Sequence, residues 1–384
     1  MRIFLSLSPS GNASVPISQT WLHNLYEPLL DLGHSVFLIR IDEAAKLLKT
    51  KRGTSKFKEK FSEYILRKFK EEHNKSSFDL FFSYFVDDYI FPEIIDEIKK
   101  MGVLTANFSC NNTHQFYLIK NISPHFNYNL HSEKDAAEKF KKIGANPIWW
   151  PMGANPKYYY PIDIEKIYDV SFVGGNYAKR SYYIWYLLEN GIDLHCFGPN
   201  WLINKPMPYI RNCVRESRRY LDVIKTLFVL SAEKRYKYSS KVSLYDFNKR
   251  LRIKYQKNLH YPVSDEEMVR LYSQSRISLG FLEVFDNHDP SFITKQHLHL
   301  REFEAPMSGA LYFTNHCEEL TEFYEPDKEI IVFRNEYELL DKARYYLSHP
   351  VEAEKIRLAG HNRALECHTY QKRFNELFNK IGLK

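Results

Sequence analysis

The sequence predicts an α/β protein with two doubly wound parallel sheets. Two stretches of the chain alternate short apolar strands with helices, one over residues 2–150 and one from residue 168 onward. Between them, residues 151–161 contain three prolines and a glycine, which is typical of a linker. With 384 residues, of which 44% are hydrophobic, the chain is globular in composition and long enough for two cores.

The first domain opens with a βαβ pattern. The apolar segment at residues 2–8 predicts a buried strand, and a helix is expected at about 15–32. Gly33 ends that helix before a second strand at 35–41, so parallel strands with a crossover helix are the expected result. The later elements keep this alternation. We expect strands at 78–85, 103–108, 126–130 and 147–150, and helices at 55–73, 91–100 and 132–143.

The second domain repeats the alternation after the linker. A strand at 168–173 leads into a helix at 179–190, which Gly191 ends. The further elements follow the same periodicities. We expect strands at 193–197, 259–261, 276–282 and 311–314, and helices at 264–274, 336–347 and 366–381.

A basic insertion with helical patterning interrupts the second domain at about residues 201–257. Residues 205–257 hold fifteen Lys/Arg and four Asp/Glu, a charge of +11, so the rest of the chain is slightly acidic. This surface could bind anionic lipid headgroups, nucleic-acid phosphates or an acidic glycan, or it could be a solvated helical hairpin. The candidate contacts are Arg218, Arg219, Arg250 and Arg252.

Composition also indicates a compartment. The five cysteines are scattered and form no Cys-x-x-Cys pair, which favours a reducing environment over disulfides or zinc. The apolar start at residues 2–7 is too short for a signal peptide, and no stretch is long enough to span a membrane. We predict a cytoplasmic protein, with peripheral membrane contact through the basic insertion as the alternative.

Gly174 and Gly175 join a predicted strand to a helix. Paired glycines let backbone N–H groups approach a ligand, and the N-terminus of the following helix favours an anion. Lys179 and Arg180 add positive charge where a diphosphate would lie. The competing interpretation is a tight turn with solvated basic residues.

Glu304 lies on a predicted helix that Gly309 ends, just before the apolar strand at 311–314. This order places the carboxylate at the carboxyl ends of parallel strands, where open α/β sheets bind ligands. A carboxylate there suits a vicinal diol, such as a ribose, because it accepts two hydroxyl hydrogen bonds. The competing interpretation is an amphipathic helix with a solvated Glu.

Four sequence features, taken in order, resemble a known family. They are F-V-G-G at 172–175, a basic residue that opens the next helix, L-R-E-F-E at 300–304 followed by Gly309, and H-T-Y-Q-K-R at 368–373. Together they resemble the C-terminal domain of GT-B glycosyltransferases, most closely the spore-maturation (CgeB-type) group. The resemblance covers about residues 168–200 and 258–384, whereas in the first 150 residues only the order of strands and helices agrees.

The resemblance implies the GT-B architecture, in which two Rossmann-like domains face a cleft and the second domain holds a nucleotide-sugar donor. It implies that Arg180 and Arg301 contact the diphosphate, where a cation stabilises the charge that develops as the sugar leaves. It also implies that Glu304 binds the ribose. For Arg301 the competing interpretation is a surface salt bridge to Glu302.

Position 296 departs from the pattern of the related retaining enzymes. There, two glutamates separated by seven residues hold the donor, and Glu304 matches the second of them. The first position is Gln296, which removes a carboxylate near the donor sugar, although Lys295 or Gln296 could still hydrogen-bond it. Retention of the anomeric configuration and independence of metal ions are implied by the resemblance alone.

Two segments of the first domain follow predicted strands at the edge where a ligand would bind. Gly11 lies in the segment after the first strand, and the resemblance implies a contact to donor or acceptor, with a turn and helix cap as the alternative. His114 closes a polar segment after the strand at 103–108 and is a candidate for positioning an acceptor hydroxyl. A structural or capping histidine is the competing interpretation.

The sequence gives little support for a metal site. Asp286-Asn287-His288-Asp289 with His297 and His299 lacks helical spacing, and Pro290 indicates a loop. Asp87-Asp88 is a weak pair. We therefore predict no metal and no cofactor other than the nucleotide-sugar, which is a substrate.

These observations lead to one predicted organisation. Residues 1–152 form the acceptor domain, 153–365 form the donor domain, and 366–384 form a helix that packs back on the first domain. The predicted function is transfer of a sugar from a nucleotide-sugar to a glycan, lipid-linked or nucleic-acid acceptor. The alternative is a non-catalytic glycan- or nucleic-acid-binding protein on the same scaffold.

Overall fold

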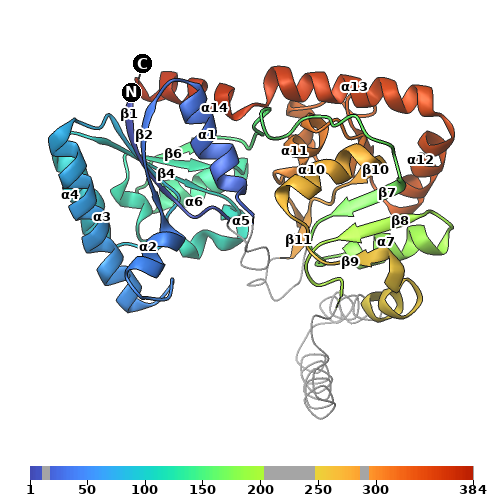
Figure 1. Cartoon of the computed structure of the whole chain (residues 1–384), viewed down its shortest axis with the longest axis horizontal. Coiled ribbons are helices and arrows are strands. Elements are labelled where there is room, and N and C mark those ends of the chain that lie inside the picture. The colour runs from blue at the N-terminus through green and yellow to red at the C-terminus, as the bar shows by residue number, and fades with distance from the viewer. Residues whose placement is uncertain (11–17, 203–246, 286–293, 384) are drawn as a thin grey trace, which may run out of the picture. The chain divides into compact units, whose positions relative to one another are not determined.

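The computed structural model describes residues 1–10, 18–202, 247–285 and 294–383. The chain forms two compact units, of which unit 1 comprises Met1–Tyr159 with Ala364–Lys384 and unit 2 comprises Tyr160–Arg363. Each unit contains a six-stranded parallel sheet packed between helices (Figure 1). The predicted fold class, two Rossmann-like domains, is confirmed. The chain passes between the units at residues 159–160 and 363–364, whereas the sequence placed these boundaries at 152–153 and 365–366.

The sheet of unit 1 has the strand order β2-β1-β3-β4-β5-β6, and every pairing is parallel. Its strands are β1 (Arg2–Leu7), β2 (Ser35–Arg40), β3 (Leu80–Ser83), β4 (Leu104–Ser109), β5 (Tyr128–His131) and β6 (Pro147–Trp149). Its main helices are η1 (Leu22–Tyr26), α1 (Glu27–Asp31), α2 (Ile41–Leu47), α3 (Ser55–Lys75), α4 (Pro92–Lys100), α5 (Asn112–Gln115), α6 (Ala137–Lys142) and α14 (Tyr370–Ile381). The helix expected at 15–32 is shorter within the described residues and begins with the π-helical η1.

Alternating side chains bury both faces of this sheet. Phe4 and Phe81 are register partners, and the ring of Phe4 packs 5.3 Å from that of Phe69 on α3. The neighbouring Phe82 points to the other face, where its ring lies 5.8 Å from Phe374 on α14. Because both faces are covered, the strands are continuous apolar runs rather than alternating ones.

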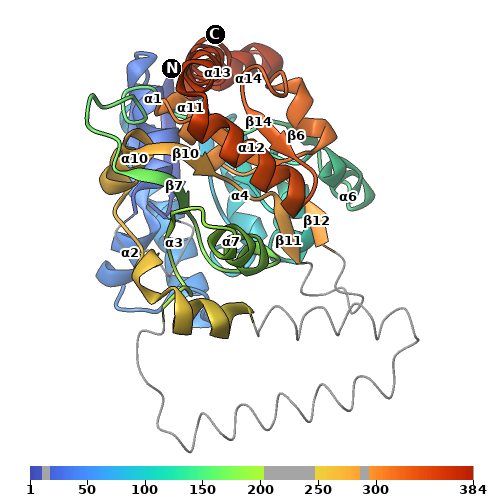
Figure 2. The ribbon, with the colours of Figure 1, turned by 90° about the vertical axis from the view of Figure 1, so that its right-hand side faces the viewer.

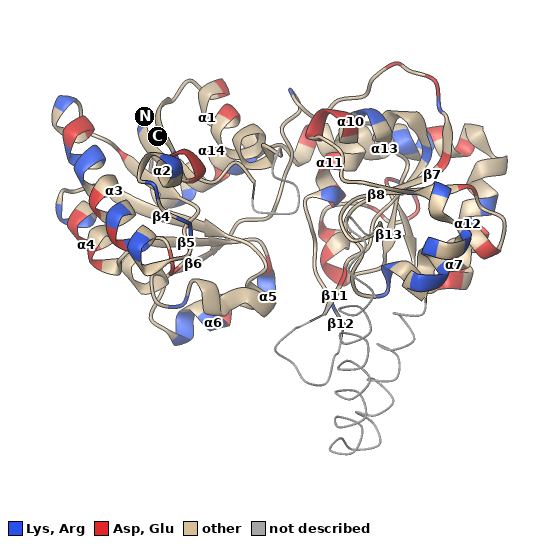
Figure 3. Ribbon diagram, turned by 60° about the horizontal axis from the view of Figure 1, so that its bottom comes forward, with Lys and Arg blue, Asp and Glu red and all other residues tan. Residues whose placement is uncertain are grey.

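The many charged residues of α3 lie mostly on the face of the helix that is exposed to solvent. Lys, Arg, Asp and Glu are interspersed along it (Figure 3), and Glu71 accepts hydrogen bonds from Arg67 and Lys68 at 2.8 Å each. Exposed pairs of this kind keep the helix soluble and contribute little to stability. None of the helices in the described ranges is long and apolar enough to cross a membrane.

The sheet of unit 2 has the strand order β14-β13-β10-β7-β8-β9, again with every pairing parallel. Its strands are β7 (Tyr168–Val173), β8 (Leu194–Phe197), β9 (Leu259–His260), β10 (Ser275–Leu279), β13 (Tyr312–Asn315) and β14 (Ile331–Phe333). Its main helices are α7 (Arg180–Glu189), α10 (Asp265–Gln274), α11 (Arg301–Met307), α12 (Glu336–Ser348) and α13 (Pro350–Cys367), the last of which runs into unit 1. The strand order reverses between β7 and β10, which makes their carboxyl ends the switch point where such sheets bind ligands.

The sequence did not predict the hairpin that follows β10. The strand expected at 276–282 ends at Leu279. Gly280 follows it, and only glycine fits there, because the Tyr312 hydroxyl would lie 1.7 Å from a Cβ. The chain then forms β11 (Glu283–Phe285) and β12 (Thr294–Gln296), an antiparallel pair (Figure 2). With this hairpin the chain leaves the sheet before it enters α11.

The segment His368-Thr369 divides the predicted last helix into α13 and α14. Ala154 donates its N–H to the His368 carbonyl at 3.0 Å, and Thr369 caps α14 by accepting from the Lys372 N–H at 3.2 Å. The buried Arg373 donates to the Met152 carbonyl at 3.3 Å. The H-T-Y-Q-K-R motif therefore fastens the end of the chain to residues 152–154 of unit 1.

We predict that Arg373→Ala destabilises unit 1, because it leaves the buried Met152 carbonyl without this donor and removes a packed side chain. The expected loss is about 3 kcal/mol in free energy of unfolding, measured by urea denaturation with a probe in unit 1. The matched control is Lys372→Ala, since Lys372 is exposed on the same turn. Equal stability of the two variants would show that the motif does not hold the chain end.

Candidate active site

Close backbone packing shapes the turn that follows β7. Gly174 donates its N–H to the Phe197 carbonyl at 2.9 Å and accepts from the Trp201 indole N–H at 2.7 Å. A Cβ on Gly198 would lie 2.2 Å from the Gly174 carbonyl oxygen, so only glycine fits at 198. The turn is thus held against the end of β8, and its shape is set before any ligand arrives.

Arg180 is buried at the start of α7 and joins two loops. The residue is only 6% exposed. Its guanidinium donates to the Gly175 carbonyl at 2.9 Å and to the Phe281 carbonyl at 3.0 Å. The guanidinium also stacks 3.6 Å above the Tyr177 ring. Burial lowers the pKa of Arg180, yet a guanidinium titrates so far above neutrality that it stays charged. The predicted contact of Arg180 with a diphosphate stays a prediction, and the geometry supports a positioning role.

Lys179 is the more accessible cation of the pair. Its side chain is 45% exposed, and its ammonium nitrogen lies 3.7 Å from an oxygen of Glu283 at the start of β11. Lys179 occupies the N-cap position of α7, so its charge adds to the partial positive charge of the helix N-terminus. The two cations that follow the Gly174-Gly175 turn therefore differ in what they do, because Arg180 holds the loops and Lys179 faces outward.

Arg301 and Glu304 form an ion pair at the N-terminus of α11. Glu304 is fully buried, whereas the Arg301 side chain is 34% exposed. The Arg301 Nε also donates to the Val173 carbonyl at 3.5 Å, which ties α11 to the end of β7. The solvated Glu considered for position 304 is wrong, because this carboxylate lies inside the unit beside the switch point.

The surface salt bridge between Arg301 and Glu302 is also wrong, since Glu302 is buried on the other side of the helix. Its carboxylate accepts from the His299 backbone N–H at 2.5 Å and from the Tyr312 hydroxyl at 2.7 Å. Burial raises the pKa of Glu302 to about 7. Sequence reasoning missed this residue because a short helix buried on every side carries no polar stripe to reveal it.

Gln296 is the last residue of β12 and pairs with Glu283, the first residue of β11, in the antiparallel ladder. Its side chain is exposed. The predicted sugar-binding position is therefore on a hairpin, beside a carboxylate that the sequence had not singled out.

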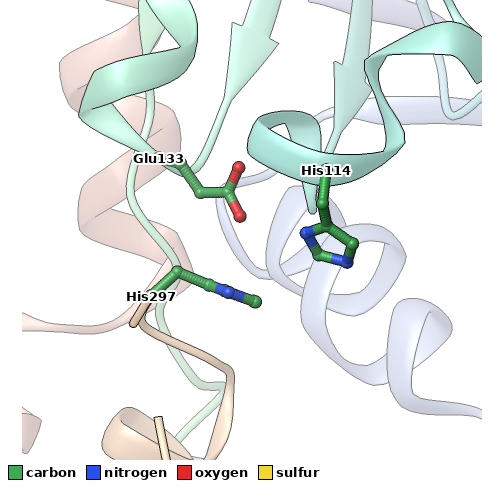
Figure 4. Close-up of side chains that lie close together, drawn as sticks. All are labelled: His114, Glu133 and His297. Carbon is green, nitrogen blue, oxygen red and sulfur yellow. The ribbon is translucent and has the colours of Figure 1, made fainter. Parts of the chain in front are cut away.

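In unit 1, His114 lies on the short helix α5, which follows β4. Asn111 precedes it with a positive φ of 62°. Glu133, at the end of β5, accepts the Thr113 backbone N–H at 2.6 Å, so the carboxylate is held beside the segment that carries His114 (Figure 4). Burial raises the pKa of Glu133 and lowers the pKa of His131 to about 4. The role of His114 toward an acceptor stays a prediction.

The remaining predicted residues divide into two groups. Gly11, Arg218, Arg219 and Asp286–Asp289 lie outside the described residues. Arg250 is exposed, whereas Arg252 donates to the Asn200 and Trp201 carbonyls at 2.7 Å each and so ties the base of the insertion to the end of β8. Asp87 accepts the N–H groups of Asn121 and Ile122 at about 3 Å, which gives the Asp87-Asp88 pair a structural role.

Two Rossmann-like units, with a glycine turn and paired cations at the switch point of the second, define a protein of the GT-B glycosyltransferase class. The profile of the family described as glycosyl transferase-like matches residues 187–379. The chain belongs to this family. No curated protein matches the sequence.

Solved structures agree with this fold. A sucrose-phosphate synthase from Thermosynechococcus elongatus and a glycosyltransferase from Rickettsia africae ESF-5 each superpose with a TM-score of 0.58 and 12% identity, over 99% of this chain and 98% of theirs. HepE from Anabaena, in complex with UDP and glucose, superposes with a TM-score of 0.56 and 8% identity over 99% of both chains. At these identities the likeness shows the fold.

Glu302 gives a testable pH dependence of stability. A pKa raised from 4.5 to about 7 means that folding favours the protonated carboxyl, so its contribution is complete below about pH 4.5 and is lost as pH rises through 7. We predict that Glu302→Gln, which stays neutral, loses less stability than wild type over that range, by on the order of 3 kcal/mol. Urea denaturation at a series of pH values measures this difference.

The control for this experiment is Glu266→Gln, because Glu266 is exposed on α10. Its stability should change with pH in parallel with that of the wild type. A Glu302→Gln curve that also runs parallel would show that Glu302 does not titrate near neutrality.

Proposed function

We propose that the protein transfers a sugar from a nucleotide-sugar donor bound by unit 2 to an acceptor bound by unit 1, without a catalytic metal. The observation that carries this proposal is the buried Glu304 carboxylate beside Arg301, at the switch point of the unit 2 sheet. A carboxylate next to cations fits a ribose diol joined to a diphosphate. Family membership supports the same reaction class.

The proposed role of each side chain follows from the charge that develops on the donor during transfer. As the bond between sugar and diphosphate breaks, negative charge grows on the departing nucleoside diphosphate, and fixed cations stabilise it. Arg301 and Lys179 are the partly exposed cations of this site, and α7 directs its N-terminus toward it. Arg180 positions the turn that would cradle the phosphates, and Glu304 would accept the ribose hydroxyls. These side chains would supply the positive charge that a metal ion supplies in other transferases.

UDP-sugars are the first donors to test. HepE from Anabaena has been solved with UDP, with UDP and glucose, and with UDP-glucose, and its fold resembles this one. The transferred sugar is a hexose or a pentose. We also propose that the protein is of the spore-maturation type, which the motifs at 172–175, 300–304 and 368–373 support.

The acceptor is a glycan, a lipid-linked glycan or a nucleic acid. The +11 charge of residues 205–257 supports an anionic acceptor or an anionic surface near it. The same charge supports the second candidate function, a non-catalytic glycan- or nucleic-acid-binding protein on this scaffold. The two functions differ in whether unit 2 binds a nucleotide-sugar.

We predict that one sugar nucleotide raises the melting temperature of the wild type but not that of Glu304→Gln. The panel comprises UDP-, GDP-, ADP-, TDP- and CMP-sugars, each tested by thermal shift. A ligand at about 100 times its Kd adds about 2.7 kcal/mol to the folded state, which gives a visible shift. Gln keeps the shape of Glu304 but loses the charge, and Glu266→Gln is the matched control that should respond like the wild type.

If no sugar nucleotide stabilises the wild type, the transferase proposal fails. Binding of DNA whose affinity falls steeply with added salt would then favour the binding-protein function.

We also predict that transfer retains the anomeric configuration of the donor, as the match of Glu304 to the second glutamate of the retaining enzymes implies, although Gln296 replaces the first. Proton NMR of the first product, recorded before mutarotation, distinguishes the two anomers by their coupling constants. The inverted anomer would contradict retention and leave the transferase proposal standing.

A further inference from the structure

Glu283 is a buried carboxylate beside the proposed donor site. It begins β11, is 8% exposed, and has one oxygen, Oε1, 3.7 Å from Lys179 Nζ. The other oxygen, Oε2, is buried and has no hydrogen-bond partner among the residues that the structure describes. A buried carboxylate oxygen without a donor is costly, so a bound ligand that supplies one would remove that cost.

Hydrogen bonds fix the backbone that leads into Glu283. Arg180 donates to the Phe281 carbonyl at 3.0 Å, and the Leu282 N–H donates to the Asn315 side chain at 3.1 Å. The Leu282 carbonyl in turn accepts the His297 N–H at 3.2 Å. These bonds come from α7, from β13 and from the residue after β12, so the segment that carries Glu283 is held by three parts of the unit, which restricts where its side chain can lie.

A second polar group accompanies the carboxylate. Gln296 lies directly opposite Glu283 in the antiparallel ladder, and residues in that relation project from the same face of the hairpin. An amide beside a carboxylate offers both donors and acceptors, which is the combination that sugar hydroxyls need.

Two cation–carboxylate pairs flank the Gly174-Gly175 turn. Arg301, paired with Glu304, is tied to Val173 just before the turn, and Lys179, paired with Glu283, follows the turn. A nucleotide-sugar has the same order of chemistry: a ribose diol, two phosphates and a second polyol. If Glu304 takes the ribose, Glu283 is left for the other end of the diphosphate.

We propose that Glu283 accepts a hydrogen bond from a hydroxyl of the transferred sugar and so distinguishes a nucleotide-sugar from the free nucleotide. This inference rests on the proposed function, because it assumes that unit 2 binds the donor. It assigns the sugar end of the site to the β11–β12 hairpin. Burial raises the pKa of Glu283 while Lys179 opposes that rise, so a hydroxyl donor would further favour the ionised carboxylate.

The test compares each sugar nucleotide with its own nucleoside diphosphate by isothermal titration calorimetry on the full chain. The probes are UDP-glucose with UDP, GDP-mannose with GDP, ADP-glucose with ADP, and TDP-glucose with TDP. Glu283→Met, which keeps the volume but cannot accept a hydrogen bond of comparable strength, should weaken binding of the preferred sugar nucleotide about tenfold or more and leave the diphosphate within about twofold. Glu266→Gln should change neither affinity.

Lys179→Met distinguishes direct contact from an effect through the cation. It should weaken the sugar nucleotide and the diphosphate by the same factor, because Lys179 faces the phosphates that both ligands share. Equal losses for Glu283→Met would show that Glu283 only holds Lys179, and no loss would show that it does not touch the sugar; either result overturns the inference while leaving the proposed function in place. A wild type that binds none of the probes overturns both.

A measurement on the wild type guards against a variant that does not fold. Donors with single hydroxyls replaced by hydrogen are titrated, and one position should lose about tenfold in affinity for the wild type. Glu283→Gln, whose melting temperature is checked first, should show no further loss with that analogue. If every deoxygenated donor binds the wild type as well as the parent sugar does, no hydroxyl is recognised and the inference fails.

Discussion

The site in unit 2 depends on one buried guanidinium. Arg180 spans the switch point of the sheet and donates to a carbonyl in the loop after β7 and to another in the segment after β10. Backbone bonds tie the turn after β7 to the end of β8, and Arg180 links that turn to the segment after β10. A planar cation with several donors fixes both at once. This connection helps to place both Lys179, which adjoins Arg180 in the chain, and Glu283, which closely follows the Phe281 carbonyl that Arg180 holds.

The cost of burying so much charge explains the composition of the site. Glu283, Glu302 and Glu304 are all buried within a few residues of β10 and α11, and carboxylates in such places must be paired, hydrogen-bonded or protonated. Glu304 is paired with Arg301 and Glu283 with Lys179, whereas Glu302 is hydrogen-bonded and has a raised pKa. Lys179 is more exposed than Arg301, and its partner Glu283 has an oxygen, Oε2, with no hydrogen-bond partner among the described residues. This unsatisfied oxygen lies beside the proposed donor site.

The sequence was informative wherever one local pattern decides the structure. The strand at 168–173 and the Gly174-Gly175 turn were predictable because an apolar run and a glycine pair need no tertiary information. The β11–β12 hairpin was not, because its strands have only three residues each and the segment before it bonds to a residue much further along the chain, Leu282 N–H to the Asn315 side chain. Glu302 and Glu283 were missed for the same reason. A glutamate in a short, fully buried element looks in the sequence like a solvated one, and only packing from distant strands distinguishes the two.

The family motifs combine residues with different roles in a way that the sequence could not show. In H-T-Y-Q-K-R the buried His368, Tyr370 and Arg373 bond to residues 152–154 and stabilise unit 1. In R-E-F-E the two glutamates have different partners. Glu302 accepts a hydrogen bond from Tyr312 inside the unit, whereas Glu304 forms an ion pair with Arg301 at the switch point. A helix turns about 100° per residue, so two glutamates two positions apart face different surroundings. A family motif therefore does not by itself identify the residues that bind substrate. These residues must be identified from the position of each side chain in the structure.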